Sequence, residues 1–204
     1  MIEFRISPSA FFAILCLFHF PEGGYVLVVT VGIDLAAKEH NPTGFAIWND
    51  GFIRTFTVYS DLEIISSCLR AYPSLIAIDA PLTFNQGYRE ADKALIRMGI
   101  RVFPPNFVSE LTFRAMRLKA RLRNVIEVFP KAFYKILNVT EADLEKFVVF
   151  LNKPQSKHET DAAVCALIAA MTLEGKTEAI GRKGEKIIIP RKGEKPPPIK
   201  DEIF

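Results

Sequence analysis

Residues 75–81 of this chain read LIAIDAP, and this stretch decides the fold. Its first four residues are apolar, which is typical of a strand buried in a sheet. The stretch nevertheless ends in Asp79, and Pro81, which cannot continue a sheet, follows almost at once. An unpaired carboxylate at the edge of an apolar core is costly. Asp79 is therefore either a cap for the next turn, as aspartate often is, or a residue with a function at the strand end.

The segments before this stretch indicate a meander of three strands. The first run is rich in β-branched residues and ends at Asp34, and the next two runs flank an Asp-Gly turn at 50–51. Such a turn between two apolar runs is typical of a hairpin. The three strands are expected over residues 26–33, 44–50 and 52–59.

The rest of the chain alternates between helix and strand. Helices are expected over residues 62–72, 88–98, 107–122, 131–151 (in two pieces around Asn138) and 157–175, and strands over 75–79 and 124–130. Strands that are separated by a helix should lie parallel. The predicted fold class is α/β, with a mixed sheet of five strands covered by helices.

Length and composition indicate one globular domain. The chain has 204 residues, of which half are hydrophobic and about a quarter charged. The domain is expected over residues 26–190, and its last segment, RKGEKIIIP (182–190), can add a short strand. The following RKGEKPPPI (191–199) predicts a basic, proline-rich, solvated tail that runs to residue 204.

The first 25 residues are expected to form an apolar extension to this domain. Their FFAILCLFHF is too short to span a bilayer, and they lack the features of a good signal peptide. Three widely spaced cysteines without metal-ligand spacing favour free thiols in a reducing cytoplasm. Only two glutamines beside plentiful Ile, Lys, Arg and Glu hint at a thermophilic source.

Positive charge is concentrated in one stretch of the chain. The net charge is +3, but residues 88–123 hold nine Lys or Arg and three acids. Such a concentration favours a polyanionic partner. Arg114, Arg117 and Arg121 share one helix face by their spacing, and Arg89 opens the helix after Asp79. These arginines are expected either to bind the phosphates of a nucleic acid or to form an ordinary solvated face.

Four carboxylates are placed where they can converge. Asp34 and Asp79 end strands, Glu127 lies within the strand over 124–130, and Asp161 lies early in the last helix. The carboxyl ends of parallel strands open onto a common crevice. Acids that meet without partners repel one another and favour bound cations, and oxygen ligands favour Mg²⁺ or Mn²⁺. His158 shares a helix face with Asp161 and is a candidate for proton transfer or metal ligation.

Each acid also has a plain structural explanation. Asp34 can be a turn residue, Glu127 can pair with a nearby arginine, and Asp161 can complement the positive N-terminus of its helix. The four together are better explained by a metal site. In that reading Asp79 ends its strand because a metal ligand is needed there.

Six segments in this order resemble a family of unknown function numbered 429, described as predicted RNase H-like nucleases. They are VGIDLA (31–36), IAIDAPL (76–82), YREADKALIRMGIRVFPPN (88–106), VIEVFP (125–130), KHETDAAVCALIAA (157–170) and GEKIIIP (184–190). The resemblance implies an RNase H-like fold. The arrangement is also similar to that of RuvC-type resolvases, which implies that Asp34, Asp79 and Asp161 with His158 hold metal. Glu127 belongs to the VIEVFP motif of the narrower family.

The leading hypothesis is therefore a metal-dependent nuclease that hydrolyses DNA or RNA phosphodiester bonds with two metal ions. Its expected catalytic residues are Asp34, Asp79, Glu127, His158 and Asp161, of which the four acids would bind Mg²⁺ or Mn²⁺. No membrane partner is expected, and the oligomeric state is open, a homodimer included. One alternative is a nucleic-acid-binding module without catalysis. Another is an actin-like or sugar-kinase-like phosphotransferase, which is disfavoured because those proteins pair two such domains around ATP.

Overall fold

A computed structural model describes residues 28–199 of the chain. The expected extension over residues 1–25 lies outside the described residues, as do residues 200–204 of the expected tail. Between residues 28 and 199, no helix combines the length and apolar character needed to cross a membrane.

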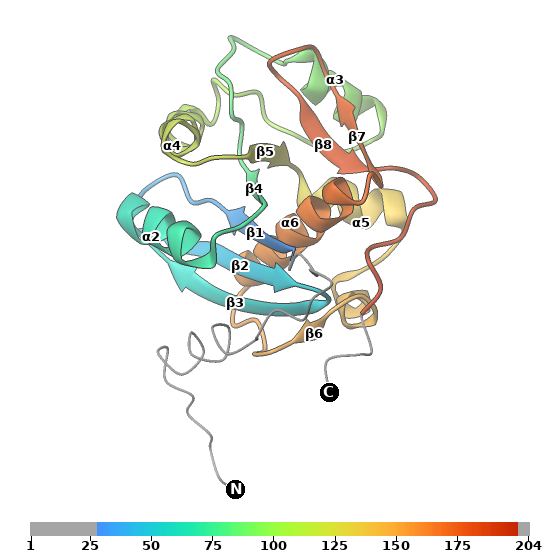
Figure 1. Cartoon of the computed structure of the whole chain (residues 1–204). Helices are drawn as coiled ribbons and strands as arrows, with labels where there is room; N and C mark the ends of the chain where they lie inside the picture. Colours follow the sequence, from blue (N-terminus) through green and yellow to red (C-terminus); the bar gives the residue numbers. More distant parts are fainter. Residues whose placement is uncertain (1–27, 200–204) are drawn as a thin grey trace, which may run out of the picture.

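The centre of the molecule is one mixed sheet (Figure 1). Its eight strands follow the order β6-β3-β2-β1-β4-β5-β8-β7. The first three strands form an antiparallel meander, and β4, β5 and β8 follow parallel to β1. The strands are β1 Val29–Asp34, β2 Thr43–Asn49, β3 Phe52–Val58, β4 Leu75–Asp79, β5 Val125–Val128, β6 Val149–Phe150, β7 Thr177–Ile180 and β8 Ile187–Pro190.

The predicted α/β class and mixed sheet are confirmed, and the strand count of five is wrong. The five expected strands occupy neighbouring places in the order β3-β2-β1-β4-β5. Strand β8 is the short strand expected from RKGEKIIIP. The two additional strands, β6 and β7, lie at the two edges of the sheet.

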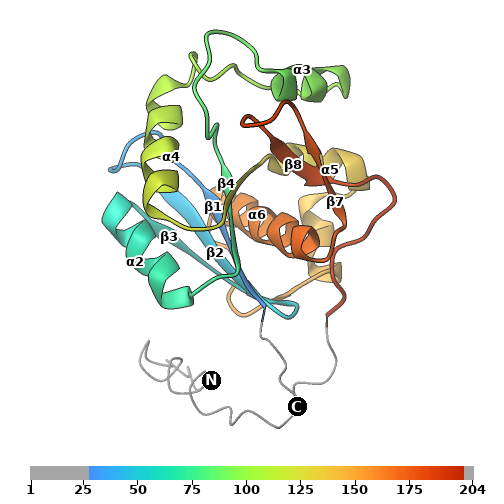
Figure 2. The same ribbon diagram turned by 45° about the horizontal axis from the view of Figure 1, so that its top comes forward.

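Helices cover both faces of this sheet. They are α2 Asp61–Ala71, α3 Glu90–Arg97, α4 Ser109–Arg121, α5 Pro130–Leu137, the 3₁₀ helix η1 Glu141–Lys146 and α6 Lys157–Leu173. Helix α6 lies across one face, and α2 and α4 cover the other (Figure 2). Asn138 divides the expected helix over 131–151 because it takes a left-handed conformation after α5.

Two glycines set the distance between α6 and the sheet. A Cβ atom at Gly32 would overlap the backbone of Ala162, and one at Gly44 would overlap the backbone of His158. Thr30 Oγ1 also donates a hydrogen bond of 2.8 Å to the Ala166 carbonyl. Only glycine permits so close an approach, so the sequence of β1 and β2 places the first turns of α6 beside the end of β1.

A buried acid fixes the start of α6 on the third strand. The Glu159 carboxylate accepts hydrogen bonds from Thr55 Oγ1 (3.1 Å) and Thr57 Oγ1 (2.9 Å) on β3, and from the Gln155 amide (2.9 Å). These bonds satisfy the carboxylate, which is only 4% exposed. The helix that carries His158 and Asp161 is therefore anchored at its first turn.

The segment after β8 packs against the domain. Pro196 and Pro197 are buried, and Ile199 lies beside Gly51 in the turn between β2 and β3. The expectation of a solvated tail is wrong for these two prolines. Proline has no amide hydrogen, so its burial leaves no donor without a partner.

Candidate functional site

Asp34 and Asp79 lie next to each other at the ends of two parallel strands. The strands β1 and β4 pair in register, with Asp34 opposite Asp79. Side chains alternate along a strand, so Asp34 shares the face of Thr30 and Gly32, and Asp79 shares the face of Ala77. That face is the one that α6 covers. The two carboxylates are therefore neighbours on a single face, as the strand-end pattern predicts.

The first turns of α6 bring two more predicted residues to this place. His158 Nδ1 lies 2.5 Å from Asp34 Oδ2, which makes it a direct partner of that carboxylate. Asp161 lies one turn further along the helix, and its carboxylate forms an ion pair of 3.3 Å with Lys157. His158 is half exposed, whereas the side chains of Asp34 and Asp161 are 16% and 17% exposed.

The three aspartates interact through their charges. Burial raises the pKa of Asp79 well above its ordinary value, and the charges of Asp34, Asp161 and Glu127 raise it further. Burial also raises the pKa of Asp34, against the effect of the hydrogen bond with His158. Within the described part of the chain, the Asp79 carboxylate has no hydrogen-bond or ion-pair partner. The negative charge of ionised Asp79 therefore lacks hydrogen-bond donors and paired cations. A bound cation would stabilise that charge.

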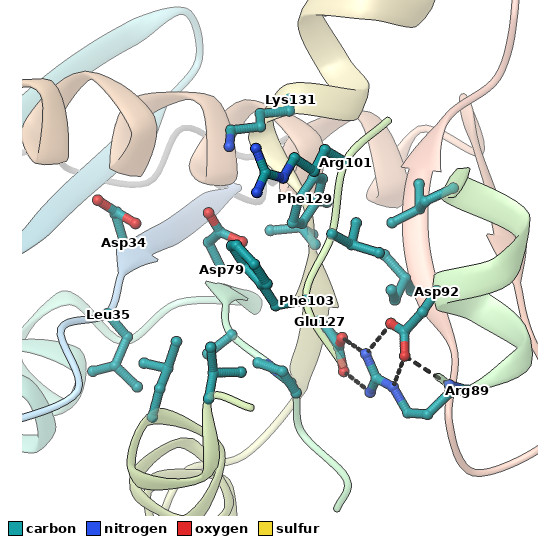
Figure 3. A pocket seen from close by; sticks show the side chains of 18 residues that line it. Asp34, Leu35, Asp79, Arg89, Asp92, Arg101, Phe103, Glu127, Phe129 and Lys131 are labelled. Carbon is teal, nitrogen blue, oxygen red and sulfur yellow. Dashed lines mark hydrogen bonds and ion pairs between the residues drawn. The ribbon is translucent and has the colours of Figure 1, made fainter. Parts of the chain in front are cut away.

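A cavity opens in front of Asp34 and Asp79 (Figure 3). It has a volume of about 400 Å³, and its wall combines the two acids with cationic, aromatic and aliphatic side chains. Arg101 and Lys131 extend into it from the connection after α3 and from α5, and Phe103 also lines it. Asp161 does not line this cavity.

Glu127 also lines the cavity, but it points to another face of the sheet and has hydrogen-bond partners. Its register partner on β4 is Ile78, so Glu127 points to the face opposite that of Asp79. The carboxylate accepts two hydrogen bonds from the Arg89 guanidinium, of 2.9 and 2.6 Å, and one of 2.8 Å from the Leu82 amide. Asp92 accepts a further hydrogen bond of 2.9 Å from Arg89.

This network corrects two expectations. Burial opposes the charge on Arg89, but its bonds with Glu127 and Asp92 outweigh that effect and raise the Arg89 pKa. Arg89 is 2% exposed, so it holds the turn after β4 and does not present a guanidinium to a nucleic acid. Glu127 accepts three hydrogen bonds and is paired with a buried guanidinium, so it is a structural acid and not a ready metal ligand.

The amino-acid sequence was then compared with known proteins. The sequence profile of a family described as protein of unknown function (DUF429) matches residues 32–145, more than half of the chain. The chain belongs to the DUF429 family. No curated protein and no solved structure matches it.

The DUF429 region includes the strand ends of β1, β4 and β5 but stops before α6. Asp34, Asp79, Arg89 and Glu127 therefore lie in the part shared with the family, and the RNase H-like nuclease reading of this DUF429 protein stays a prediction. His158 and Asp161 lie outside the matched residues.

The donor atoms near Asp79 fit a hard divalent cation. Asp34 and Asp79 offer carboxylate oxygens, which Mg²⁺ and Mn²⁺ prefer, and the Asp79 carboxylate has no hydrogen-bond or ion-pair partner among residues 28–199. Within residues 28–199, no three His, Cys, Asp or Glu side chains already form a metal-ligating group. The free cysteines Cys68 and Cys165 are both buried, and burial raises the pKa of the Cys68 thiol to about 12. Neither thiol therefore suits a thiolate metal site.

The three arginines of α4 do not form one phosphate-binding face. Arg114 is 1% exposed, and its guanidinium bonds Asp61 Oδ1 (2.8 Å) and the carbonyls of Ala36 (2.8 Å) and Tyr59 (2.5 Å). It joins α4 to α2 and cannot reach a phosphate, so the expectation for Arg114 is corrected. Arg117 and Arg121 are largely solvent-accessible and stay candidates.

Sequence reasoning missed the cavity residues Arg101, Phe103 and Lys131. Two signals pointed to them. Arg101 and Phe103 lie in the segment YREADKALIRMGIRVFPPN that carries the family resemblance, and Lys131 directly follows VIEVFP. Residues just past the carboxyl ends of parallel strands line the crevice, so Lys131 was accessible to the same argument as Asp79.

Proposed function

We propose that this protein is a divalent-metal-dependent nuclease, which hydrolyses phosphodiester bonds of nucleic acids with Mg²⁺ or Mn²⁺. The observation that carries the proposal is the pairing of Asp34 with Asp79. The two carboxylates lie side by side at neighbouring strand ends, and the Asp79 carboxylate has no protein partner in the described chain. Both face a cavity whose wall also carries cationic side chains. Such an arrangement stabilises a bound cation and an anionic substrate at the same place.

Each residue of the site has a distinct role in this proposal. Asp34 and Asp79 would hold the metal, and Asp161 would add negative charge beside them. A bound divalent ion would lower the pKa of a water molecule and stabilise the leaving oxygen. His158 fixes the Asp34 carboxylate through Nδ1, and its half-exposed ring can exchange a proton with solvent through the other nitrogen.

One observation favours a second candidate, a nucleic-acid-binding module without catalysis. Glu127, one of the four acids expected to bind metal, forms an ion pair with the buried Arg89 instead. A protein that kept the fold and the exposed cavity cations Arg101 and Lys131 would bind nucleic acid without hydrolysing it. The two candidates differ in one measurement, which is cleavage.

The test uses labelled single- and double-stranded DNA and RNA, each incubated with Mg²⁺, Mn²⁺ or EDTA. The parent protein should cleave at least one substrate with Mg²⁺ or Mn²⁺ and none with EDTA. Asp79→Asn should lower the cleavage rate by about 100-fold or more, because a lost metal ligand removes several kcal/mol of transition-state stabilisation. Glu178→Gln, which removes an exposed charge from β7, is the matched control and should cleave like the parent. Equal cleavage by Asp79→Asn would disprove the site. Binding by the parent without cleavage under every condition would support the second candidate.

A further inference from the structure

The cavity wall carries two cationic side chains besides its two aspartates. Arg101 and Lys131 both line it and are both exposed. Within residues 28–199, neither side chain forms a hydrogen bond or an ion pair, although the Lys131 charge lies close enough to Asp79 to lower its pKa. Two cations without salt-bridge partners in one cavity suit an anionic group of a ligand.

An exposed aromatic ring lies on the same wall. Phe103 is 54% exposed, and its ring centroid lies 5.4 Å from the Arg101 guanidinium carbon. A phenyl ring that faces an open cavity beside a cation can stack against the flat face of a base. Every base has such a face, so this contact recognises a nucleotide without reading its sequence.

The shape of the cavity limits what can enter it. A volume of about 400 Å³ lies near the lower end of the range for small-ligand pockets, roughly 300–1,000 Å³. It has room for one nucleotide rather than for a stretch of duplex. Inside a duplex both faces of each base are covered by the neighbouring bases, so an unpaired base is the one that can enter the cavity and stack on Phe103.

We propose that the cavity binds one unpaired nucleotide of a single-stranded DNA or RNA, with the base on Phe103 and a phosphate between Arg101 and Lys131. The inference rests on the proposed function, because a scissile phosphate must approach Asp34 and Asp79. It adds the substrate class, which is single strands in preference to duplex, and it assigns three binding residues. RNA and DNA share this chemistry, so both are used in the test.

The competing explanation is internal. Arg101 and Lys131 would then only balance the charges of Asp34 and Asp79, and Phe103 would be an ordinary exposed apolar residue. In that case, replacing the cations would change the stability of the metal-free protein and leave nucleic-acid binding unchanged. The two explanations therefore predict different results for the same variants.

The test is fluorescence anisotropy in EDTA, so that cleavage does not intervene. The probes are labelled single strands of DNA and of RNA, each about 12 nucleotides long, and the matching blunt duplexes. The parent should bind at least one single strand about 10-fold more tightly than its duplex. Phe103→Leu should weaken single-strand binding by about 10-fold without changing its salt dependence, because stacking on an aromatic ring contributes roughly 1–3 kcal/mol per base. Arg101→Gln and Lys131→Gln should each lower the slope of log K against log[salt] by about 0.7.

Two control variants lie outside the cavity wall. Phe107→Leu changes a ring that is 77% exposed in the same connection, and Lys153→Gln removes an exposed cation next to the edge strand β6. Both should bind like the parent. Equal affinity for single strands and duplex, or a Phe103→Leu variant that binds like Phe107→Leu, would overturn the inference.

The outcome is separable from that of the proposed function. Metal-dependent cleavage together with binding that ignores Phe103, Arg101 and Lys131 would leave the function standing and remove this inference. Single-strand binding that depends on these residues, without cleavage under any condition, would keep the inference and favour the non-catalytic module.

Discussion

The crevice at the strand ends has two halves, and both carry buried or partly buried acids. In one half the acids are paired with a cation, and in the other they are not. On the β5 side, Glu127 accepts three hydrogen bonds and shares the buried Arg89 guanidinium with Asp92. On the β1–β4 side, Asp34 has only His158, and Asp79 has no partner in the described chain. The sequence predicted that Asp34, Asp79 and Glu127 act together with Asp161.

The difference teaches how to tell a structural acid from a candidate ligand. A buried acid that is paired with a cation and hydrogen-bonded stabilises its own surroundings, and breaking its pair is costly. A carboxylate without partners at the mouth of a cavity can instead form its favourable charge interaction with a bound cation. Removing one charge should therefore lower the stability of the folded protein in the paired half and should not lower it in the unpaired half.

The largest effect is expected where the paired half is broken. Arg89→Met leaves Glu127 and Asp92 buried without a cation, so the free energy of unfolding should fall by about 3–5 kcal/mol. Urea unfolding of the parent and the variant measures this change. Arg97→Met, on the exposed side of the same helix, is the control and should stay within about 0.5 kcal/mol of the parent. A loss for Arg89→Met no larger than that of the control would contradict the structural role of the network.

A smaller effect is expected where the position of α6 is disturbed. Gly32→Ala places a methyl group against the backbone of Ala162, and overpacking of this kind costs about 1–3 kcal/mol. The variant should also lose most of its thermal stabilisation by Mg²⁺, because His158 and Asp161 move away from Asp34. Melting curves with Mg²⁺ and with EDTA measure both changes. An unchanged melting temperature would show that the helix can shift freely.

The unpaired half should reveal itself in the pH dependence of the metal-free protein. The folded protein raises the pKa of Asp79 above its unfolded value, so the folded state binds more protons in the pH range above that value. The free energy of unfolding in EDTA should therefore decrease as the pH rises through this range. Asp79→Asn should flatten the dependence and be at least as stable as the parent at neutral pH.

Part of the slope should remain in Asp79→Asn, because burial also raises the pKa of Asp34 and Asp161. Denaturant unfolding in EDTA at several pH values, from mildly acidic to neutral, measures the slope. Glu178→Gln should follow the parent. A parent protein whose stability rises with pH over this range would contradict the assignment.

The smallest effect is expected for the exposed arginines of α4. The double variant Arg117→Ala, Arg121→Ala should fold like the parent, because an exposed ion pair such as that of Arg117 with Asp61 contributes little. If these side chains contact phosphates, the salt slope of single-strand binding should fall by about 0.7 per arginine. Anisotropy titrations at several salt concentrations measure the slope. An unchanged slope would assign both residues to an ordinary solvated face.

Much of the fold was readable from local patterns. The meander, the strand LIAID and the long final helix follow from hydrophobic period and turn chemistry, and these signals agree with one another. The additional strand β6 has only two residues, and β7 (TEAI) lacks the mostly apolar run that marked β5 and β8. Both lie at the edges of the sheet, next to β3 and β8.

The candidate site was predictable only where a strand end fixes a side chain. Asp34 and Asp79 each end a strand, and their common face follows once β1 and β4 are parallel and in register. Glu127 lies inside VIEV, where one residue of register decides which face it takes, and no local pattern sets that register. The burial of Arg114 depended on α2 packing against α4, which its helical spacing does not encode.

The glycines at 32 and 44 also decide where this protein can adapt. Because backbone meets backbone there, α6 and the central strands move as one body, and the spacing between Asp34 and the first turn of α6 is fixed in advance. Any adjustment to ligands of different size falls to the two connections that complete the cavity wall, residues 80–89 and 98–108. The first of these connections is hydrogen-bonded to Glu127 near both of its ends, through the Leu82 amide and the Arg89 guanidinium. Selectivity for one ligand over another should therefore be altered most readily by changes in the second.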